Sequence, residues 1–456
     1  MLQHHTLNVI CNYKTNTMLK KELKKLVGLK KEEFDAFVIS KQIQVQPARL
    51  IPTLKTGDEM ALTSIFLSTV RLVKEYRDDI FKELKLTRSG KVYYYTEACF
   101  PEIDKSRIDG LIIIVIKGVI SDAAFFEMKN KNSGLEKDQI EKYLDISKKL
   151  KVSKLVTVSN EFVADPSHSP IKIKPPKSIA LSHFSWTYLI TKGQLLLFKN
   201  DTNIEDEDQV EIMRETLHYF ENPVSGISGY TQMKAGWKEV AESIRAQKQL
   251  KVSDECVEDA VLSWYEEEKD MALLLSRNLG VLVKSSSKNK ESIKKDISRL
   301  VKDNHINGSL AVKNSVSDIK ISAEFERRMV SMSVKVTPPM DKGTVARISW
   351  IARQLENCRK KSQDTFNSIE GNIWIEADIK FAKANLKIKL SELSELSDQV
   401  NGKEIQAFHI ILGHSFGAGF ASNKKFISLI EQMLLDYYEG VVQHMTNWNR
   451  PAPKLT

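Results

Sequence analysis

The chain has 456 residues, of which 42% are hydrophobic and 28% charged, and its formal net charge is +9. This length allows roughly three domains at about 150 residues each. Its longest apolar run, Leu111 to Ile116, is far short of the roughly 18 to 20 residues that a membrane span needs, so no membrane partner is expected. The N-terminus lacks the pattern of a secretory signal, and the four cysteines form no C-x-x-C pair. We therefore expect a cytoplasmic protein without a disulfide framework.

The basic charge balance favours a nucleic-acid partner, although only weakly. The chain has 68 Lys and Arg against 59 Asp and Glu, and its pI is near 9.0. Neutralising phosphates drives non-specific binding to nucleic acids, so a basic excess is typical of such proteins. Many cytosolic proteins are equally basic, and the excess is thin over a chain of this length.

The first 160 residues predict a helix, three strands, a second helix and a fourth strand. A helix is expected from Asp58 to Leu84, where apolar residues recur on one face. The three extended runs span 91–98, 108–116 and 123–129, with a turn at Lys117-Gly118. An amphipathic helix is expected at 137–150 and a β-branched strand at 154–159.

The rest of the chain predicts a helical segment followed by a second mixed region. Four prolines between 166 and 176 indicate a loop or a domain edge. Residues 206–279 are helical in pattern, and the charged run from Glu266 to Asp270 is expected on a solvated face. Beyond residue 280 we expect strands at 330–336 and 372–380 and helices at 345–357 and 425–445.

These patterns predict an α/β protein in three parts. Residues 1–200 would form the first domain with an N-terminal extension, and residues 201–279 a helical segment. Residues 280–456 would form a C-terminal mixed α/β domain for recognition, regulation or dimerisation.

The strongest functional candidate lies on two neighbouring predicted strands. Glu127 and Lys129 end one strand, and since side chains alternate along a strand, they point to the same face. Asp109 stands at the beginning of the preceding strand. The run from Leu111 to Ile116 in that strand is apolar at every position, as expected of a strand buried on both faces. If the strands are antiparallel neighbours, Asp109 lies opposite Glu127, and a hard divalent cation would relieve the repulsion of the two carboxylates. Lys129 would then orient the attacking water or stabilise the developing negative charge.

An acid followed two residues later by a lysine is a common pattern, so its context decides. The pair Asp378 and Lys380 also ends a predicted strand and is the nearest competitor. It lacks a partner strand that opens with Asp-Gly and a following helix that carries Gln.

Three motifs together resemble the PD-(D/E)XK nuclease superfamily. They are Arg107-Ile108-Asp109-Gly110, Glu127-Met128-Lys129 and Gln139-Ile140-Glu141-Lys142-Tyr143, the last being similar to the Gln-x-x-x-Tyr helix of the RecB-like branch. The resemblance implies a restriction-endonuclease-like core, which is a mixed sheet flanked by helices. The chain departs from the family pattern at Ile108, which stands where the family has its proline.

The resemblance also implies roles for individual residues. Asp109 and Glu127 would bind Mg²⁺ or Mn²⁺, and Lys129 would serve the attacking water. Gln139 and Tyr143 lie one helical turn apart and would support the site or contact substrate, although both could equally be ordinary exposed positions.

One further acid and the expected activity complete this hypothesis. Glu97 is the candidate for the additional acid that many family members carry on a helix before the Asp, although here it falls in a predicted strand. The implied activity is endo- or exonuclease cleavage of nucleic acid, DNA rather than RNA, in defence against foreign DNA, such as antiviral restriction, or in DNA repair. A homodimer is conceivable because cutting both strands needs two sites.

Two other functions stay open. The string Gly413-His414-Ser415-Phe416-Gly417 imitates the nucleophile elbow of serine hydrolases, but His444 is the only histidine that follows it. The chain could also be an inactive nuclease-fold scaffold that binds nucleic acid or a protein partner. A glycine-rich phosphate loop with Lys-Ser/Thr is absent from the sequence, so no intrinsic nucleotide-triphosphate site is expected.

Overall fold

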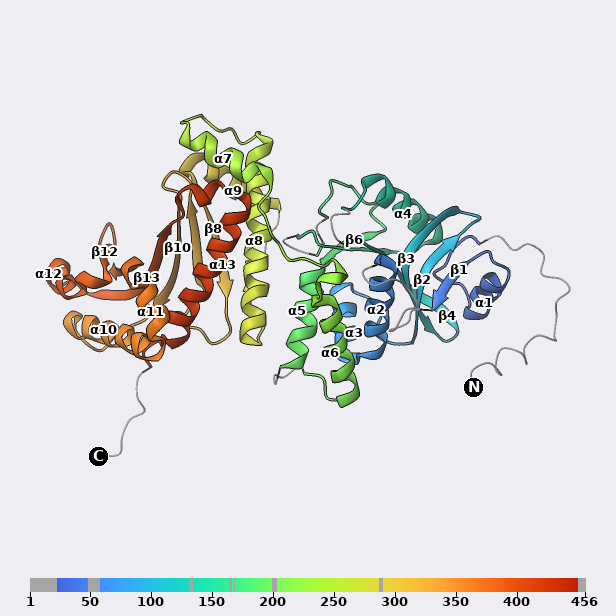
Figure 1. Ribbon diagram of the computed structural model, residues 1–456, viewed down its shortest axis with the longest axis horizontal. Coiled ribbons are helices and arrows are strands. Elements are labelled where there is room, and N and C mark those ends of the chain that lie inside the picture. The colour runs from blue at the N-terminus through green and yellow to red at the C-terminus, as the bar shows by residue number, and fades with distance from the viewer. Residues whose placement is uncertain are drawn as a thin grey trace.

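Two β-sheets organise the protein. The computed structural model describes residues 23–47, 58–130, 134–163, 166–167, 169–198, 203–286 and 290–449. Figure 1 shows each sheet in its own half of the molecule. We call residues 23–221 the N-terminal half, residues 235–449 the C-terminal half, and residues 222–234 the connection.

The N-terminal half is a mixed sheet flanked by helices. Among the described residues its sheet has six strands in chain order, antiparallel from the first to the fourth and parallel from the fourth to the sixth. The strands are β1 (Gln44–Pro47), β2 (Lys91–Phe100), β3 (Asp104–Ile116), β4 (Val119–Met128), β5 (Lys154–Ser159) and β6 (Ala180–Ser185). The helices are α1 (Lys31–Ile39), α2 (Glu59–Leu72), α3 (Lys74–Glu83), α4 (Lys137–Leu150), α5 (Trp186–Leu197) and α6 (Glu207–Glu221).

Strand β3 is buried on both faces, as its apolar sequence predicts. Leu111 and Ile113 belong to a core that includes residues of α1 and α4. Ile112 and Ile114 belong to a second core with residues of α2, α3, α5 and α6. A strand with helices on both sides cannot alternate between apolar and polar residues, which explains the unbroken apolar run.

The predicted helix from Asp58 to Leu84 is wrong in one respect, because the structure divides it into α2 and α3. Val73 separates the two helices with an extended backbone, φ −102° and ψ 108°. Its side chain is fully buried, and its β-branched shape is compatible with extended backbone. The apolar face continues across the break, so hydrophobic periodicity alone does not reveal it.

Other predicted elements agree with the structure. The helix at 137–150 and the strand at 154–159 have the bounds of α4 and β5. The strands near 330–336 and 372–380 correspond to β10 and β11 of the second sheet. Within the described ranges, no helix is both long and apolar enough to cross a membrane.

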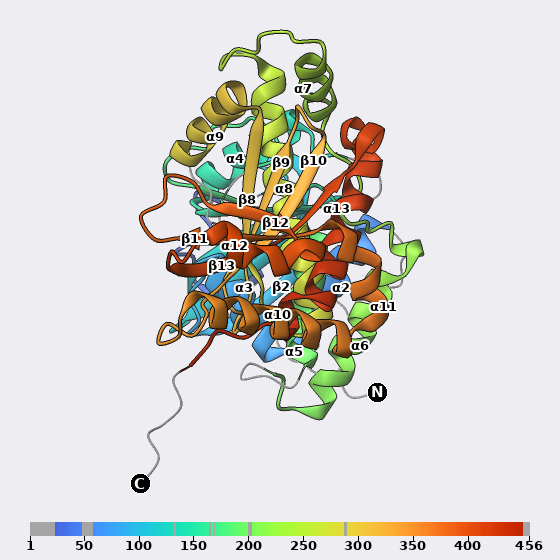
Figure 2. The same cartoon turned by 90° about the vertical axis from the view of Figure 1, so that its left-hand side faces the viewer.

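The C-terminal half is built on an antiparallel sheet. In the described part of the chain this sheet has seven strands in the order β12-β11-β13-β10-β9-β8-β7. The strands are β7 (Lys284–Ser285), β8 (His305–Ala311), β9 (Ile319–Glu324), β10 (Met329–Val336), β11 (Ile373–Ile379), β12 (Leu386–Lys389) and β13 (Ile405–Ser415). The helices are α7 (Ala235–Arg245), α8 (Glu255–Leu279), α9 (Lys290–Asp303), α10 (Thr344–Lys361), α11 (Gln363–Ile369), α12 (Leu396–Val400) and α13 (Asn423–Gly440). Figure 2 views the molecule from this half.

Helix α8 lies between the C-terminal sheet and helix α5 of the other half (Figure 1). Leu273 of α8 packs in a core of the N-terminal half, and Arg277 donates a hydrogen bond to Thr191 of α5 at 3.3 Å. Trp264 and Met271 pack in the core of the C-terminal half. Helix α8 therefore has neighbours on both sides.

The expectation that the acidic run on α8 is solvated is wrong. Glu266, Glu267, Glu268 and Asp270 are 6%, 0%, 0% and 3% exposed. The two halves enclose the helix, so few of its positions face solvent, and a charged run predicts a solvated face only for a helix with one free side. Burial raises the pKa of Glu266 and of Asp270 to about 7, and Lys234 beside Glu266 and Arg277 beside Asp270 partly oppose the rise.

Candidate active site

Strands β3 and β4 bring Asp109 and Glu127 together. The strands are antiparallel neighbours, as the site hypothesis requires, and Gly110 pairs with Phe126. The next positions outward are Asp109 and Glu127, and the backbone N–H of Met128 donates to Asp109 Oδ2 at 2.7 Å. This hydrogen bond holds the Asp109 carboxylate against the end of β4.

Gly110 allows helix α2 to pack close to Asp109. A Cβ atom at Gly110 would lie 3.0 Å from Leu67 Cδ1 and 3.0 Å from Phe126 Cβ. Any larger residue would therefore push α2 away from β3 or distort the pairing with β4. The Asp-Gly sequence thus has a packing reason beside its chemical one.

Glu127 is a buried carboxylate with one lysine beside it. Its side chain is fully buried, and Lys129 Nζ lies 2.9 Å from its Oε1. Within the described residues, neither carboxylate oxygen accepts a hydrogen bond of good geometry. A buried carboxylate is costly, and the ion pair with Lys129 offsets part of that cost.

Both carboxylates are harder to ionise than usual. Burial, followed by the charge of Glu127, raises the pKa of Asp109 well above its ordinary value, against the opposing effects of the Met128 N–H and Lys129. Burial also raises the pKa of Glu127, and Lys129 opposes that rise. Two acids that resist ionising together are suited to a divalent cation, which stabilises both negative charges.

Lys129 is a charged lysine at the end of β4. Burial lowers its pKa, but the charges of Glu127, Glu59 and Asp109 outweigh burial, so the net pKa is raised. Trp186 Nε1 donates to the carbonyl oxygen of Lys129 at 2.8 Å. The Lys129 ammonium group therefore stays protonated. Trp186, the first residue of α5, holds the Lys129 backbone.

Glu59 is the residue that sequence reasoning missed. It is the first residue of α2, and its Oε2 lies 3.3 Å from Lys129 Nζ while its Oε1 accepts from the Asn130 N–H at 3.5 Å. The preceding Asp58 caps the helix by accepting from the Met60 N–H at 2.8 Å. The sequence signal available for Glu59 was its place directly after a helix-capping Asp. That signal does not predict that Glu59 lies beside β4, which depends on the tertiary fold.

Glu97 lies across from Asp109 but is paired elsewhere. Thr96 pairs with Gly110 and Ala98 with Ile108, which places Glu97 beside Asp109 on β2. Its φ of 54° is rare for a non-glycine residue, and Arg107 Nη1 lies 3.4 Å from its Oε2. The structure therefore joins Glu97 to Arg107 at the edge of the site.

Gln139 and Tyr143 tie helix α4 to the site. Gln139 Nε2 donates to the Tyr143 hydroxyl at 3.0 Å, and that hydroxyl donates to the Arg107 carbonyl at 2.6 Å. Burial, together with the charges of Glu127 and Asp109, raises the pKa of Tyr143. Tyr143 thus supports the strand two residues before Asp109.

The ligand set for a metal is small. No group of three His, Cys, Asp or Glu side chains close enough to hold a metal occurs among the described residues. Asp109 and Glu127 provide two carboxylates, and Glu59 is engaged by Lys129. Two carboxylates fit Mg²⁺ or Mn²⁺, since Mg²⁺ commonly binds through one or two carboxylates and keeps several waters.

The competing acid and lysine on β11 have a different environment. Asp378 pairs with Lys335 at 3.4 Å and Lys380 with Glu404 at 2.9 Å. All four side chains are substantially more exposed than Glu127. Asp378 and Lys380 therefore each form a surface salt bridge with another residue.

The serine elbow does not assemble in the described residues. Ser415 is the exposed last residue of β13 and has no histidine partner there. His444 instead lies 2.8 Å from the Ser362 hydroxyl, Nε2 to Oγ. His183 is buried beside Thr157, and burial lowers its pKa to about 4.

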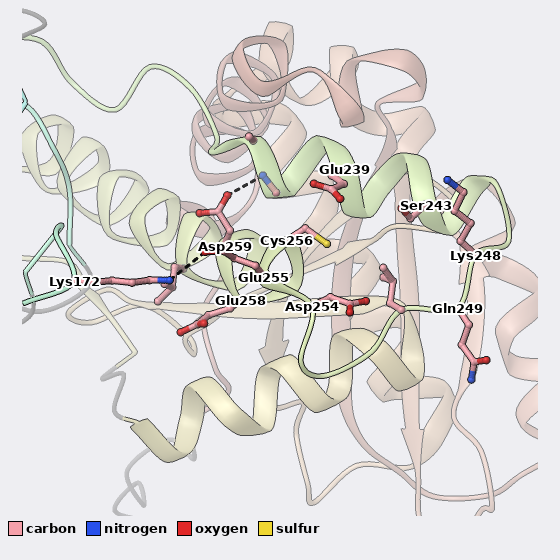
Figure 3. A pocket seen from close by; sticks show the side chains of 14 residues that line it. Lys172, Glu239, Ser243, Lys248, Gln249, Asp254, Glu255, Cys256, Glu258 and Asp259 are labelled. Carbon is pink, nitrogen blue, oxygen red and sulfur yellow. Dashed lines mark hydrogen bonds and ion pairs between the residues drawn. The ribbon is translucent and has the colours of Figure 1, made fainter.

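A pocket of about 760 Å³ lies between α7 and the start of α8 (Figure 3). Five acids line it, and Lys172 reaches it by pairing with Glu255 at 3.4 Å. The Gly236 N–H donates to Asp259 at 2.8 Å. None of the predicted site residues lines this pocket, so it is separate from the carboxylates on β3 and β4.

Comparisons of the chain with protein-family models, curated proteins and solved structures gave no match.

Proposed function

We propose that this protein is a metal-dependent nuclease of the PD-(D/E)XK type that hydrolyses phosphodiester bonds in DNA. The observation that carries the proposal is the buried Glu127 carboxylate, which lies across from Asp109 and beside Lys129. In this proposal the antiparallel strands β2 to β4, the parallel strand β5 and helix α4 are the restriction-endonuclease-like core. Gln139 and Tyr143 support that core.

Each residue then has a defined task. Asp109 and Glu127 would hold Mg²⁺ or Mn²⁺, which when bound neutralises charge on the scissile phosphate and makes a water molecule more acidic. Lys129 keeps its proton and places a positive charge where the nucleophile and the phosphate oxygens meet. Glu59 and the Trp186 indole hold this lysine in place.

The biological setting follows by analogy with the superfamily. Restriction of foreign DNA and DNA repair, both in the cytoplasm, are the proposed settings, with endo- or exonuclease action. The net charge of +9 favours phosphate binding, and Arg107 presents a side chain that is 68% exposed next to the site. A homodimer would supply two sites for cutting both strands.

One observation favours an inactive scaffold as the second candidate. Lys129 already forms ion pairs with Glu127 and Glu59, and such a triad could be purely structural. A scaffold would bind nucleic acid or a protein partner through the same half without cleaving.

The test is incubation of plasmid, single-stranded DNA and RNA with the full chain in Mg²⁺, Mn²⁺ or chelator. We expect cleavage of DNA with metal, none with chelator, and its loss in Glu127→Ala and Lys129→Ala, with circular dichroism confirming the fold. Equal cleavage by the wild type and Glu127→Ala would refute the site. DNA binding without cleavage under any metal, unchanged in both variants, would support the scaffold.

A further inference from the structure

The connection between the halves runs directly past the end of the catalytic strand. It begins at Asn222, after α6, and ends at Lys234, before α7. Its first part contains a short 3-10 turn, Pro223–Ser225, which Asn222 caps by accepting from the Val224 N–H at 3.0 Å. This turn presents two consecutive carbonyl groups, those of Ser225 and Gly226, to the sheet.

Asn130 joins this turn to the candidate site. Its side chain is 4% exposed, and its Nδ2 donates to the Ser225 carbonyl at 2.7 Å. It follows Lys129 directly, and its own backbone N–H points to Glu59 Oε1 at 3.5 Å. Asn130 therefore links the connection to Lys129, its neighbour in the chain, and to Glu59, which pairs with the Lys129 ammonium.

Asn160 makes the equivalent attachment one strand away. Its Nδ2 donates to the Gly226 carbonyl at 2.9 Å, and its Oδ1 accepts from the Ser228 N–H at 3.0 Å. It follows β5, which carries none of the three proposed catalytic residues. The chain thus contains two asparagines with similar hydrogen bonds, of which only one adjoins Lys129.

The far end of the connection is fixed to α8 and the C-terminal half. The Tyr230 hydroxyl lies 2.8 Å from Ser263 Oγ, which also accepts from the Lys234 N–H at 2.9 Å. Lys234 Nζ pairs with the buried Glu266 at 2.5 Å. The Met233 N–H donates to the Asn423 carbonyl at the start of α13, at 2.9 Å.

We propose that Asn130 is a positioning residue for Lys129, and that its hydrogen bond to the Ser225 carbonyl of the connection fixes the end of β4 where the Lys129 ammonium has to lie. This inference rests on the proposed function. The connection is thus attached at both ends, to Ser263 and Glu266 of α8 through Tyr230 and Lys234, and to Asn130 through Ser225.

The expected effect is large for a contact that touches no substrate. Misplacing a catalytic group by about 1 Å can cost on the order of 100-fold in rate. Loss of the Asn130 side chain removes the hydrogen bond between the end of β4 and the connection, and we expect the pairing of β4 with β5 to persist up to Met128. Substrate binding elsewhere is unaffected, so the loss should be in kcat with KM nearly unchanged.

The experiment compares Asn130→Ala with its matched control Asn160→Ala in the full chain, well below both melting temperatures. Both variants lose hydrogen bonds to the connection and should lose similar thermal stability. Asn130→Ala should reduce kcat by about 10-fold to 100-fold, whereas Asn160→Ala should stay within about two-fold. Equal kcat losses at equal stability would show a merely structural role and overturn the proposal.

Hydrogen–deuterium exchange of peptides spanning Met128 to Asn130 gives a second readout that needs no activity. The Lys129 N–H donates to the Val158 carbonyl at 2.8 Å, and its exchange should accelerate in Asn130→Ala but not in Asn160→Ala. Unchanged exchange in Asn130→Ala would overturn the positioning role. Absence of cleavage by the wild type, in contrast, would overturn the proposed nuclease and leave the exchange comparison intact.

Discussion

Strand β4 in the N-terminal half and strand β11 in the C-terminal half each have an acid as the second-last residue and a lysine directly after the strand. On β4, Glu127 is fully buried and its own lysine lies 2.9 Å away. On β11, Asp378 and Lys380 each pair with another residue at the surface. The same pattern therefore has two outcomes, and the surrounding layers decide between them, because helices cover both faces of the N-terminal sheet near β4.

The two strand ends also differ in the energetic cost of their charged groups. Surface ion pairs such as those of Asp378 and Lys380 contribute about 0 to 1 kcal/mol to stability. A buried carboxylate beside a second one instead carries a desolvation cost that exposed pairs do not have. Such a cost is typical of sites that bind a ligand or perform chemistry.

The largest expected effect is the loss of cleavage on neutralising the acid of β4. Glu127→Gln keeps the shape of the side chain but removes its charge, and we expect cleavage to fall by a factor of about 100 to 1,000 or more. Asp378→Asn, the matched change on β11, should stay within about two-fold. A plasmid-nicking assay in Mg²⁺ measures both, and comparable losses would show that the two strand ends do not differ in function.

Metal binding should distinguish the same two strands by thermal stability. Mg²⁺ or Mn²⁺ should raise the melting temperature of the wild type, since a ligand at 100 times its Kd stabilises by about 2.7 kcal/mol. Asp109→Asn should lose most of this shift and Asp378→Asn should keep it. Differential scanning fluorimetry with and without metal provides the measurement, and a full shift in Asp109→Asn would contradict the ligand assignment.

Glu267 of α8 is a buried acid that tests whether burial of a carboxylate without a lysine beside it lowers the stability of the fold. Both carboxylate oxygens of Glu267 lack a hydrogen-bond partner among the described residues, and burial and then Asp270 and Glu431 raise its pKa well above the ordinary value. A raised pKa means that ionisation disfavours the folded state, so stability falls as pH rises from about 4, the unfolded value, through the folded pKa. Glu267→Gln cannot ionise and should therefore melt higher than the wild type at pH 8, by a margin that shrinks toward pH 5.

Glu268 provides the control for that pH series. Its Oε1 accepts hydrogen bonds from Ser286 and from the Ser309 N–H at 2.9 Å. Glu268→Gln weakens charge-assisted hydrogen bonds and should melt lower than the wild type at pH 8. A Glu267→Gln variant that is less stable than the wild type at every pH would contradict the pKa direction.

The smallest expected effect concerns two tyrosines with the same type of hydrogen bond in different halves. Tyr143 donates to the Arg107 carbonyl at 2.6 Å, and Tyr437 of α13 donates to the Ile410 carbonyl at 2.6 Å. Each Phe variant should lose about 1 kcal/mol of unfolding free energy in urea. Only Tyr143→Phe should also reduce cleavage, by a few-fold, and an equal reduction in Tyr437→Phe would remove the argument for a supporting role.

Local patterns were sufficient to predict that Asp109, Glu127 and Lys129 lie close together. Alternation along β4 places Glu127 and Lys129 on one face, and an apolar run predicts β3 as a buried neighbour. The predicted start of that strand is wrong, because β3 begins at Asp104 and Asp109 lies within it. The features that were predicted correctly depend on residues close in sequence or on one strand pairing, so a single sequence carries them.

Features that depend on distant packing could not be predicted in this way. Glu59 reaches Lys129 only because α2 packs across the sheet, and nothing near Glu59 in the sequence indicates that contact. The acids of α8 look solvated in sequence because their burial comes from two halves closing on one helix. The break at Val73 is hidden since the apolar face continues through it.

The most direct test of the central claim compares two lysines. Single-turnover cleavage of plasmid DNA in saturating Mg²⁺ is measured for the wild type, Lys129→Ala and Lys380→Ala. We expect the cleavage rate of Lys129→Ala to be lower than that of the wild type by at least about 100-fold, and Lys380→Ala to cleave as the wild type does. Wild-type rates in Lys129→Ala would contradict the central claim.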